Sequence, residues 1–237
     1  MSVVIKYPCF ASGEPGRLAA ETIRAVATDL RRQLLGVVVR PLRIGDLVRK
    51  TKSLRVNGRT LRIAWDIEHA VHDDGGDGVL GVCEHDPDVP GTVMISLNAE
   101  LLDERPDLLR STAAHELGHA VFDMPAAMTT GTARAFRSCL EARAAHAPID
   151  WREWRADEFM GAFLTPKRQL ARSFAREAAT HGVPLRWNVE GEIPMPSISA
   201  NATDWCVVDA IAAALAEEFG VSEAFIGVRL RKYRLVR

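Results

Sequence analysis

The sequence predicts an α+β fold, with a β-hairpin and further strands followed by one long helix and several shorter ones. Residues 54–65 alternate apolar and polar side chains about Asn57-Gly58, a pattern typical of a hairpin with a type I′ turn. Residues 108–121 place apolar side chains at the spacing of a helix. With 237 residues, 47% of them hydrophobic, the chain is long enough for one good core or two small ones.

Several elements are expected before the long helix. An amphipathic helix should run from Pro15 to Leu35 and end near Gly36. We also expect a short strand at residues 37–39, a helical turn at 44–50, and strands at 79–83 and 92–97. The strands and the hairpin together form the expected sheet.

The long helix carries His115, Glu116 and His119 in the pattern HExxH. Pro106 can begin this helix, and Pro125 lies just past its end. Positions i and i+4 share one face of a helix, so the two histidines can offer imidazoles to one metal ion. Glu116 is angled toward the same pocket, where it can hold and deprotonate a water molecule. The alternative is two histidines packed on an amphipathic helix, because the bare pattern also arises by chance.

A second helix, at residues 151–164, offers further acidic groups. Glu153 and Asp157 are again four residues apart. A catalytic zinc ion usually takes three protein ligands, and Glu153 is the expected third. Asp157 can accept the other ring N–H of a ligand histidine, which fixes the tautomer of that ring. Glu158 is a competing choice of ligand, and a solvated acidic helix face is the alternative reading of the whole segment.

Three blocks of the sequence resemble one family. The stretch RSTAAHELGHAVF at residues 110–122, followed by EWRADEFMGAFLTP at residues 153–166, is similar to the ImmA/IrrE family of bacterial metallopeptidases. Residues 215–236, LAEEFGVSEAFIGVRLRKYRLV, resemble the segment that closes many members. Two departures are visible: Met160-Gly161 replaces a usual pair of small alanines, and residues 124–150 are longer than is typical.

The resemblance implies a zincin-like fold of the gluzincin kind, in which a small twisted β-sheet packs on the HExxH helix, and metal-assisted hydrolysis of peptide bonds. His115, His119 and Glu153 would bind Zn²⁺, a ligand set that also suits Mn²⁺ or Fe²⁺, and Glu116 would be the general base. It further implies a site-specific cut in a helix-turn-helix repressor, which derepresses stress-response or mobile-element genes. One rival is a non-catalytic protein of the same fold that grips a repressor without cutting it.

The chain is expected to comprise a peptidase domain over residues 1–182, an irregular loop over 183–202, and a helical pair over 203–237. Within the first, an Ala/Arg-rich helix is expected near residues 132–145 and another helix at about 166–180. The final pair turns at Gly220 and has helix-turn-helix spacing with a basic tail. Such a pair can read DNA, which makes a DNA-binding regulator the second rival. A helical hairpin packed on the peptidase is the alternative, and the isoelectric point near 6.7 favours it.

Charge is unevenly distributed although the net charge is only −1. Residues 24–62 are mostly basic, whereas residues 66–88 contain several acids and no Lys or Arg. The two stretches could face each other, or the basic one could bind an acidic partner; two solvated faces are the alternative. The four cysteines lack CxxC spacing, so we expect isolated reduced thiols. No export pattern or membrane-spanning run is found, which predicts a cytoplasmic protein.

The donor that would stabilise an oxyanion is not identified by the sequence. The chemically suitable side chains are His146, His181, Tyr233 and Tyr7. Each also fits an ordinary surface or packing position, so none is predicted to be catalytic.

Overall fold

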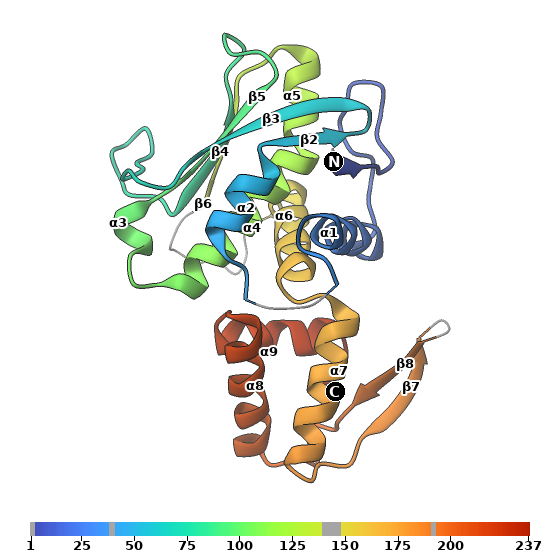
Figure 1. Cartoon of the computed structure of the whole chain (residues 1–237). Helices are drawn as coiled ribbons and strands as arrows, with labels where there is room; N and C mark the ends of the chain where they lie inside the picture. Colours follow the sequence, from blue (N-terminus) through green and yellow to red (C-terminus); the bar gives the residue numbers. More distant parts are fainter. Residues whose placement is uncertain (1–2, 38–40, 139–147, 191–192) are drawn as a thin grey trace. The chain divides into compact units, whose positions relative to one another are not determined.

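A computed structural model gives the structure of residues 3–37, 41–138, 148–190 and 193–237. Helices and strands are mixed along the chain, which confirms the predicted α+β class (Figure 1). The described residues fall into two compact units. The sheet unit lies within residues 1–38 and 42–163, and the C-terminal unit comprises Leu164–Arg237 with Pro41. We describe each unit by itself.

The sheet unit is built around a mixed six-stranded sheet in the order β1-β2-β3-β5-β4-β6. The pairs β1/β2 and β3/β5 are parallel, and the remaining pairs are antiparallel. Asn57 and Gly58 both have positive φ, as a type I′ turn requires, so the predicted hairpin is present as β2 and β3. The strands are β1 Val3–Ile5, β2 Ser53–Val56, β3 Arg59–Asp66, β4 Gly81–His85, β5 Thr92–Leu97 and β6 Arg134–Ser138.

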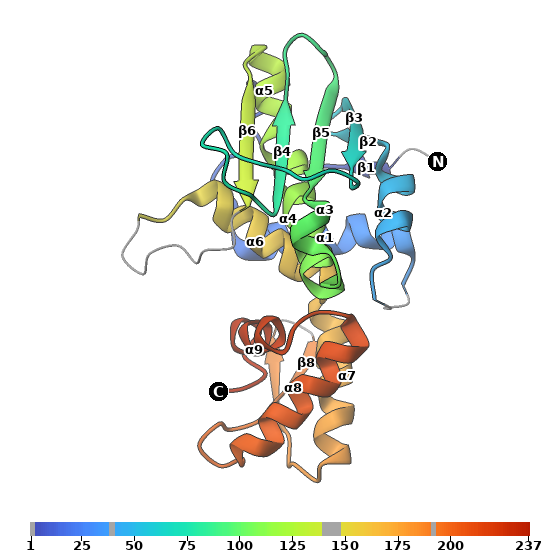
Figure 2. The same cartoon turned by 90° about the vertical axis from the view of Figure 1, so that its left-hand side faces the viewer.

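One face of the sheet is covered by the long helix α4, Pro106–Phe122, which packs against β4, β5 and β6 (Figure 2). Strand residues alternate between a buried and an exposed face: Leu61 and Ile63 are buried, whereas Thr60 and Arg62 are exposed. The apolar face therefore meets the helix that carries HExxH. The other helices of this unit are α1 Ala20–Leu35, α2 Ile44–Thr51, α3 Ala99–Leu102, α5 Met124–Thr130 and α6 Trp151–Leu164.

A close approach of two backbones brings α6 against α4. Gly118 lies inside the HExxH motif, and a Cβ built there would stand 3.1 Å from the Cα of Ala156 on α6. Such a contact is tighter than side chains normally tolerate, so the missing side chain lets α6 come close to α4. Because Glu153 is on α6, this packing also sets its distance from the histidines.

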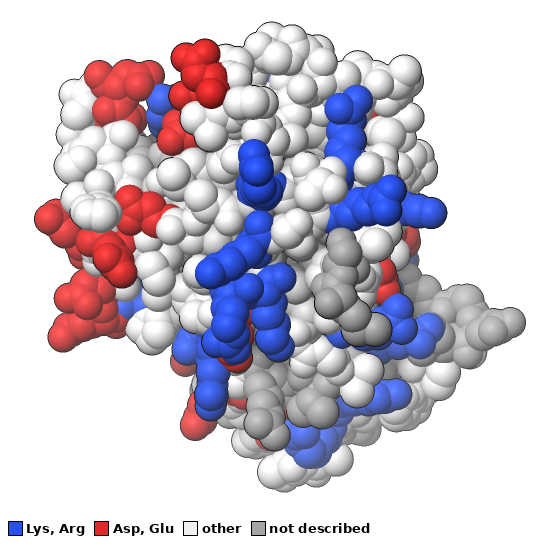
Figure 3. All heavy atoms as spheres, turned by 45° about the horizontal axis from the view of Figure 1, so that its top comes forward, with Lys and Arg blue, Asp and Glu red and all other residues white. Residues whose placement is uncertain are grey.

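Exposed charges separate on the surface of the sheet unit. Lys and Arg gather in a band over α2, β2 and β3, while Asp and Glu gather toward the side of α3 (Figure 3). Arg55, Arg59 and Arg62 of the hairpin are all exposed. The two charged stretches of the sequence thus contribute to solvated areas of the surface.

The C-terminal unit contains α7 Lys167–Thr180, α8 Trp205–Phe219 and α9 Glu223–Lys232. Gly220 adopts the left-handed conformation at the end of α8, and the Ser222 hydroxyl caps α9 by accepting from the Phe225 N–H. The helical pair that the sequence indicates is therefore present. The units divide at Leu164 rather than at residue 182, and the expected domain boundaries stay a prediction.

Two sequence-based expectations are wrong. Residues 183–202 are not simply irregular, because β7 Arg186–Glu190 and β8 Ile193–Ser197 form an antiparallel hairpin. Pro194 and Pro196 occupy alternate positions of β8, so Ile193, Met195 and Ser197 keep N–H groups available for pairing. The helix expected near residues 132–145 is also wrong where the chain is described: residues 134–138 are strand β6, paired with β4. Most of the strand expected at residues 37–39 lies outside the described residues.

No helix in the described parts of the chain has the length and apolar character needed to cross a membrane. Cys9, Cys83 and Cys206 are free thiols, in agreement with their spacing. Cys139 lies outside the described residues.

Candidate metal centre

Helix α4 presents His115 and His119 together, one turn apart. His115 is 9% exposed and His119 is 1% exposed, and their Nε2 atoms lie 3.1 Å apart. Glu116, between them in the sequence, is fully buried. The four-residue spacing thus brings both imidazoles to one point beside a buried carboxyl group, as expected for one face of a helix.

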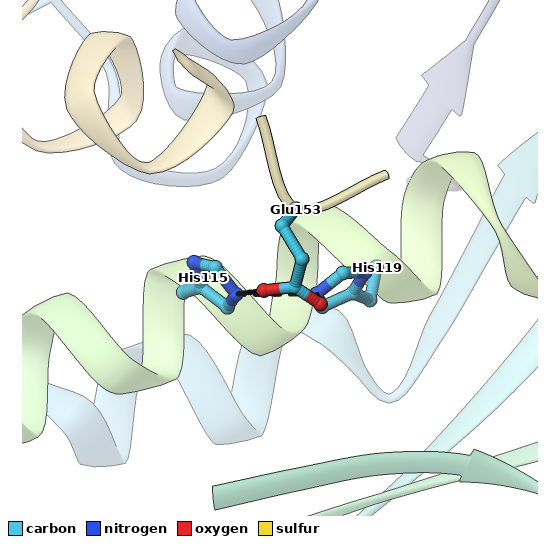
Figure 4. Close-up of side chains that lie close together, drawn as sticks. All are labelled: His115, His119 and Glu153. Carbon is cyan, nitrogen blue, oxygen red and sulfur yellow. Dashed lines mark hydrogen bonds and ion pairs between the residues drawn. The ribbon is translucent and has the colours of Figure 1, made fainter. Parts of the chain in front are cut away.

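Glu153 completes the cluster from the first turn of α6 (Figure 4). Its two carboxylate oxygens lie 3.3 Å from the Nε2 atoms of His115 and His119. Among the described residues, these three form the group of His, Cys, Asp and Glu side chains that could hold a metal ion. Tetrahedral zinc with bonds of about 2.0–2.1 Å separates its ligand atoms by roughly 3.3 Å, so the donor set fits one such ion.

The far side of each imidazole meets a carboxylate. Asp157 Oδ1 lies 3.1 Å from His115 Nδ1, where the sequence analysis expected it. Asp123 Oδ2 lies 3.0 Å from His119 Nδ1, a partner that the sequence analysis missed. Its position four residues after His119, on the same helix face, is the signal that could have found it. Both contacts favour protonation of Nδ1 and leave Nε2 for a cation.

Asp123 is itself held by a buried ion pair. Its carboxylate is 1% exposed and accepts a hydrogen bond from the guanidinium of Arg155, whose side chain is 10% exposed. Arg155 is on α6, two residues after Glu153. Helices α4 and α6 are therefore linked twice: by Glu153 with the two histidines, and by Arg155 with Asp123.

The two carboxyl oxygens of Glu116 lie in different surroundings. Its Oε1 accepts a hydrogen bond from the Ser138 hydroxyl on β6, while the buried Oε2 has no hydrogen-bond partner among the described residues. A Cβ at Gly81 on β4 would stand 3.2 Å from Glu116 Oε1 and 2.8 Å from Thr112. The absence of a side chain at Gly81 therefore leaves room for Glu116 beside β4. Burial raises the pKa of Glu116, against the opposing effect of the neighbouring histidines. A carboxylate oxygen of this kind can hold the proton of an attacking water.

The charges of the cluster depend on one another. Burial lowers the pKa of His115, but hydrogen bonds to Asp157 and Glu153 outweigh burial and raise it to about 10. Burial raises the pKa of Glu153, and hydrogen bonds from both histidines overcome this and hold it well below its usual range. The histidine protons occupy the positions that a cation would take, so metal binding releases protons.

Strand β6 also packs on the centre through an aromatic ring. Phe136 stacks on the His119 imidazole with ring centroids 4.2 Å apart and planes 7° apart. Strand β6 therefore contributes two side chains to the centre: Phe136 against His119 and Ser138 against Glu116. The sequence analysis missed this strand, and with it both residues.

A comparison with protein families gives a match over residues 64–231. The matching family is described as Peptidase_M78, IrrE N-terminal-like domain. The chain belongs to this family. Neither curated proteins nor solved structures gave a match. The match to the IrrE-like family confirms the resemblance, and it extends from β3 to α9. Membership gives the chain a metallopeptidase-like role, with a protein as substrate.

Of the remaining candidates from the sequence, the structure of this IrrE-like chain describes Glu158, Tyr7, Tyr233 and His181. Glu158 is 2.9 Å from Arg24 in a largely buried ion pair, away from the three clustered side chains. Tyr7 donates a hydrogen bond to the Val121 carbonyl, so its hydroxyl already has an acceptor. Tyr233 and His181 are in the C-terminal unit, and His146 lies outside the described residues.

Proposed function

We propose that the protein is a metal-dependent endopeptidase in which His115, His119 and Glu153 bind the ion. The observation that carries this proposal is the meeting of three ligand atoms from two helices beside the buried carboxyl group of Glu116. Zn²⁺ is the ion that suits two imidazoles and one carboxylate best, and Mn²⁺ and Fe²⁺ are the other candidates. When bound, such an ion acts as a Lewis acid and lowers the pKa of water from 15.7 toward roughly 7.

Glu116 is the general base and acid of the proposed reaction. Its Oε2, which has no hydrogen-bond partner in the part of the chain that the structure describes, takes a proton from the attacking water and later gives it to the leaving amine. Ser138 holds Oε1, so the carboxyl group keeps one orientation during this exchange. Asp157 and Asp123 keep each imidazole in the tautomer that presents Nε2.

For the substrate we propose a helix-turn-helix transcriptional repressor, whose site-specific cleavage would derepress stress-response or mobile-element genes. The support is the resemblance of three sequence blocks to the ImmA/IrrE family and the match to the IrrE-like family. We place the reaction in the cytoplasm, where such a repressor acts.

Direct DNA binding by the helical pair has less support. Arg229 belongs to the basic tail that suggested it, but this residue is only 2% exposed and its guanidinium lies over the Phe225 ring, 5.6 Å from the centroid. Arg229 is therefore not presented to a phosphate backbone, whereas the other basic residues of the tail, Arg231, Lys232, Arg234 and Arg237, are exposed.

The first test is the metal content of purified protein, measured by mass spectrometry for three forms. We expect about one zinc per chain in the natural protein and in Glu158→Gln, and loss of the metal in Glu153→Ala. Metal kept by Glu153→Ala would remove Glu153 from the ligand set.

The second test is cleavage of a repressor encoded beside this gene, followed by peptide mass mapping. Glu116→Gln should keep the metal and lose cleavage by a factor of about 10² or more. Cleavage at the natural rate by that variant would refute the role of Glu116. A metal-free natural protein that binds the repressor without cutting it would support the non-catalytic rival.

A further inference from the structure

The sheet unit has a recess whose lining does not include the three proposed metal ligands. It is a cleft of about 820 Å³ between the first turn of α6 and the segment that leads into α1. Trp151, Trp154 and Arg155 line it from α6, and Pro15, Arg17 and Leu18 line it from the other side. The proposed function makes no use of this cleft.

The apolar part of the cleft is a pair of tryptophans. Trp151 is 53% exposed, and its ring meets that of Trp154 edge to face, with centroids 5.6 Å apart. Pro15 and Leu18 supply further apolar surface. Trp154 is half-buried, so Trp151 is the exposed member of the pair. An exposed tryptophan in a recess often anchors a protein partner, because it offers a large apolar area at a low cost in conformational entropy.

Three features of the cleft lining favour a negative charge: Arg17, the Nε–H of Arg155 and the start of α1. Arg17 is exposed and makes no ion pair or hydrogen bond within the described parts of the chain. Arg155 is 9% exposed, and its Nε–H has no acceptor among the residues that the structure describes, although its terminal nitrogen binds Asp123. Ala19 also lines the cleft as the N-cap of α1, with no side chain capping the first turn. A helix N-terminus carries a partial positive charge, which adds to the charge of Arg17 because the charge of Arg155 is already paired with Asp123.

We propose that this cleft binds an acidic, apolar segment of the protein substrate. A carboxylate of that segment would lie against Arg17 and the start of α1, and an aromatic or aliphatic side chain would lie against Trp151 and Trp154. Trp154 follows the proposed ligand Glu153 directly in the sequence, so the anchored segment would be held by the helix that helps to bind the metal. The identity of the partner as substrate rests on the proposed function, whereas the binding itself does not.

The test uses two end-blocked pentapeptides, AEFEA and AKFKA, titrated by calorimetry into full-length protein carrying Glu116→Gln. We expect saturable binding of AEFEA, at least tenfold tighter than that of AKFKA. Trp151→Ala and Arg17→Glu should each weaken AEFEA binding by about tenfold or more. Both side chains are exposed, so neither change disturbs the core.

Matched controls come from the C-terminal unit. Trp187 and Trp205 are 60% and 61% exposed, and Trp187→Ala and Trp205→Ala should leave AEFEA binding unchanged. Equal affinity for the two peptides, no saturable binding of AEFEA, or equal losses in the control variants would each overturn the proposal.

This result is separable from the peptidase test, because peptide binding in the cleft needs neither metal nor Glu116. If both hold, Trp151→Ala should raise KM for the cleaved repressor and leave kcat nearly unchanged, as expected for a contact made equally in the ground state and the transition state.

Discussion

The buried ion pair behind His119 gives a prediction that needs no substrate. Arg155→Met keeps the length and the apolar stem of the side chain but removes the guanidinium that binds Asp123. Asp123 is 1% exposed and would then keep only its contact with His119, 3.0 Å away. A buried carboxylate that loses its cationic partner cannot recover solvation by water, so the folded state should lose stability.

Breaking a buried ion pair by removing one partner costs about 3–5 kcal/mol. Because Asp123 keeps His119, we expect the lower end, about 3 kcal/mol, which is roughly a hundredfold in the unfolding equilibrium. The assay is urea unfolding of metal-free protein, followed by circular dichroism and tryptophan fluorescence. Metal affinity should also fall by about 10- to 100-fold, since Asp123 orients a proposed ligand.

Arg152 on the same helix is the matched control. It lies 3.1 Å from Glu14 with its side chain 45% exposed, so water screens the pair and Arg152→Met should cost less than about 1 kcal/mol. Equal losses in the two variants, or a loss below 1 kcal/mol in Arg155→Met, would refute the reasoning that this buried pair stabilises the fold.

Three further predictions concern the centre and its surroundings. Ser138→Ala should leave metal content unchanged and lower kcat by about 10- to 100-fold, because a hydrogen bond to a charged group contributes about 1.5–3 kcal/mol. Cleavage at the natural rate would show that Ser138 does not hold Glu116 in its reactive orientation. Burial raises the pKa of the Cys83 thiol, so iodoacetamide at pH 8 should label the exposed Cys9 and Cys206 and spare Cys83, and equal labelling by mass spectrometry would contradict this. Removing the metal with a chelator should lower the thermal midpoint of unfolding in calorimetry, since a ligand that binds only the folded state stabilises it; an unchanged midpoint would count against a metal site.

Local spacing accounts for what the sequence could predict. Asn57-Gly58 specifies its own turn, and the four-residue intervals from His115 to His119 and from Glu153 to Asp157 put each pair on one helix face. The spatial cluster of His115, His119 and Glu153 follows once two such helices pack together. The roles of these residues stay a prediction until metal and activity are measured.

Pairing between distant segments explains what the sequence could not reveal. Residues 134–138, RAFRS, lie in an Ala/Arg-rich stretch with good helix propensity, yet they pair with β4 across the sheet and become β6. Phe136 and Ser138 reach the centre only through that pairing. The ion pair of Asp123 with Arg155 likewise joins residues that no local pattern connects, 32 positions apart.

Gly118 has a consequence for anyone who would transplant this centre into another scaffold. Copying His115, His119 and Glu153 would not suffice, because the gap between the two helices is fixed by an absent side chain. An alanine at position 118 would put its Cβ 3.1 Å from the Cα of Ala156, and α6 would have to retreat by a few tenths of an ångström. Glu153 would retreat with it, lengthening both of its 3.3 Å distances to the imidazoles. A designer would therefore need to specify the spacing of two backbones before choosing a single ligand.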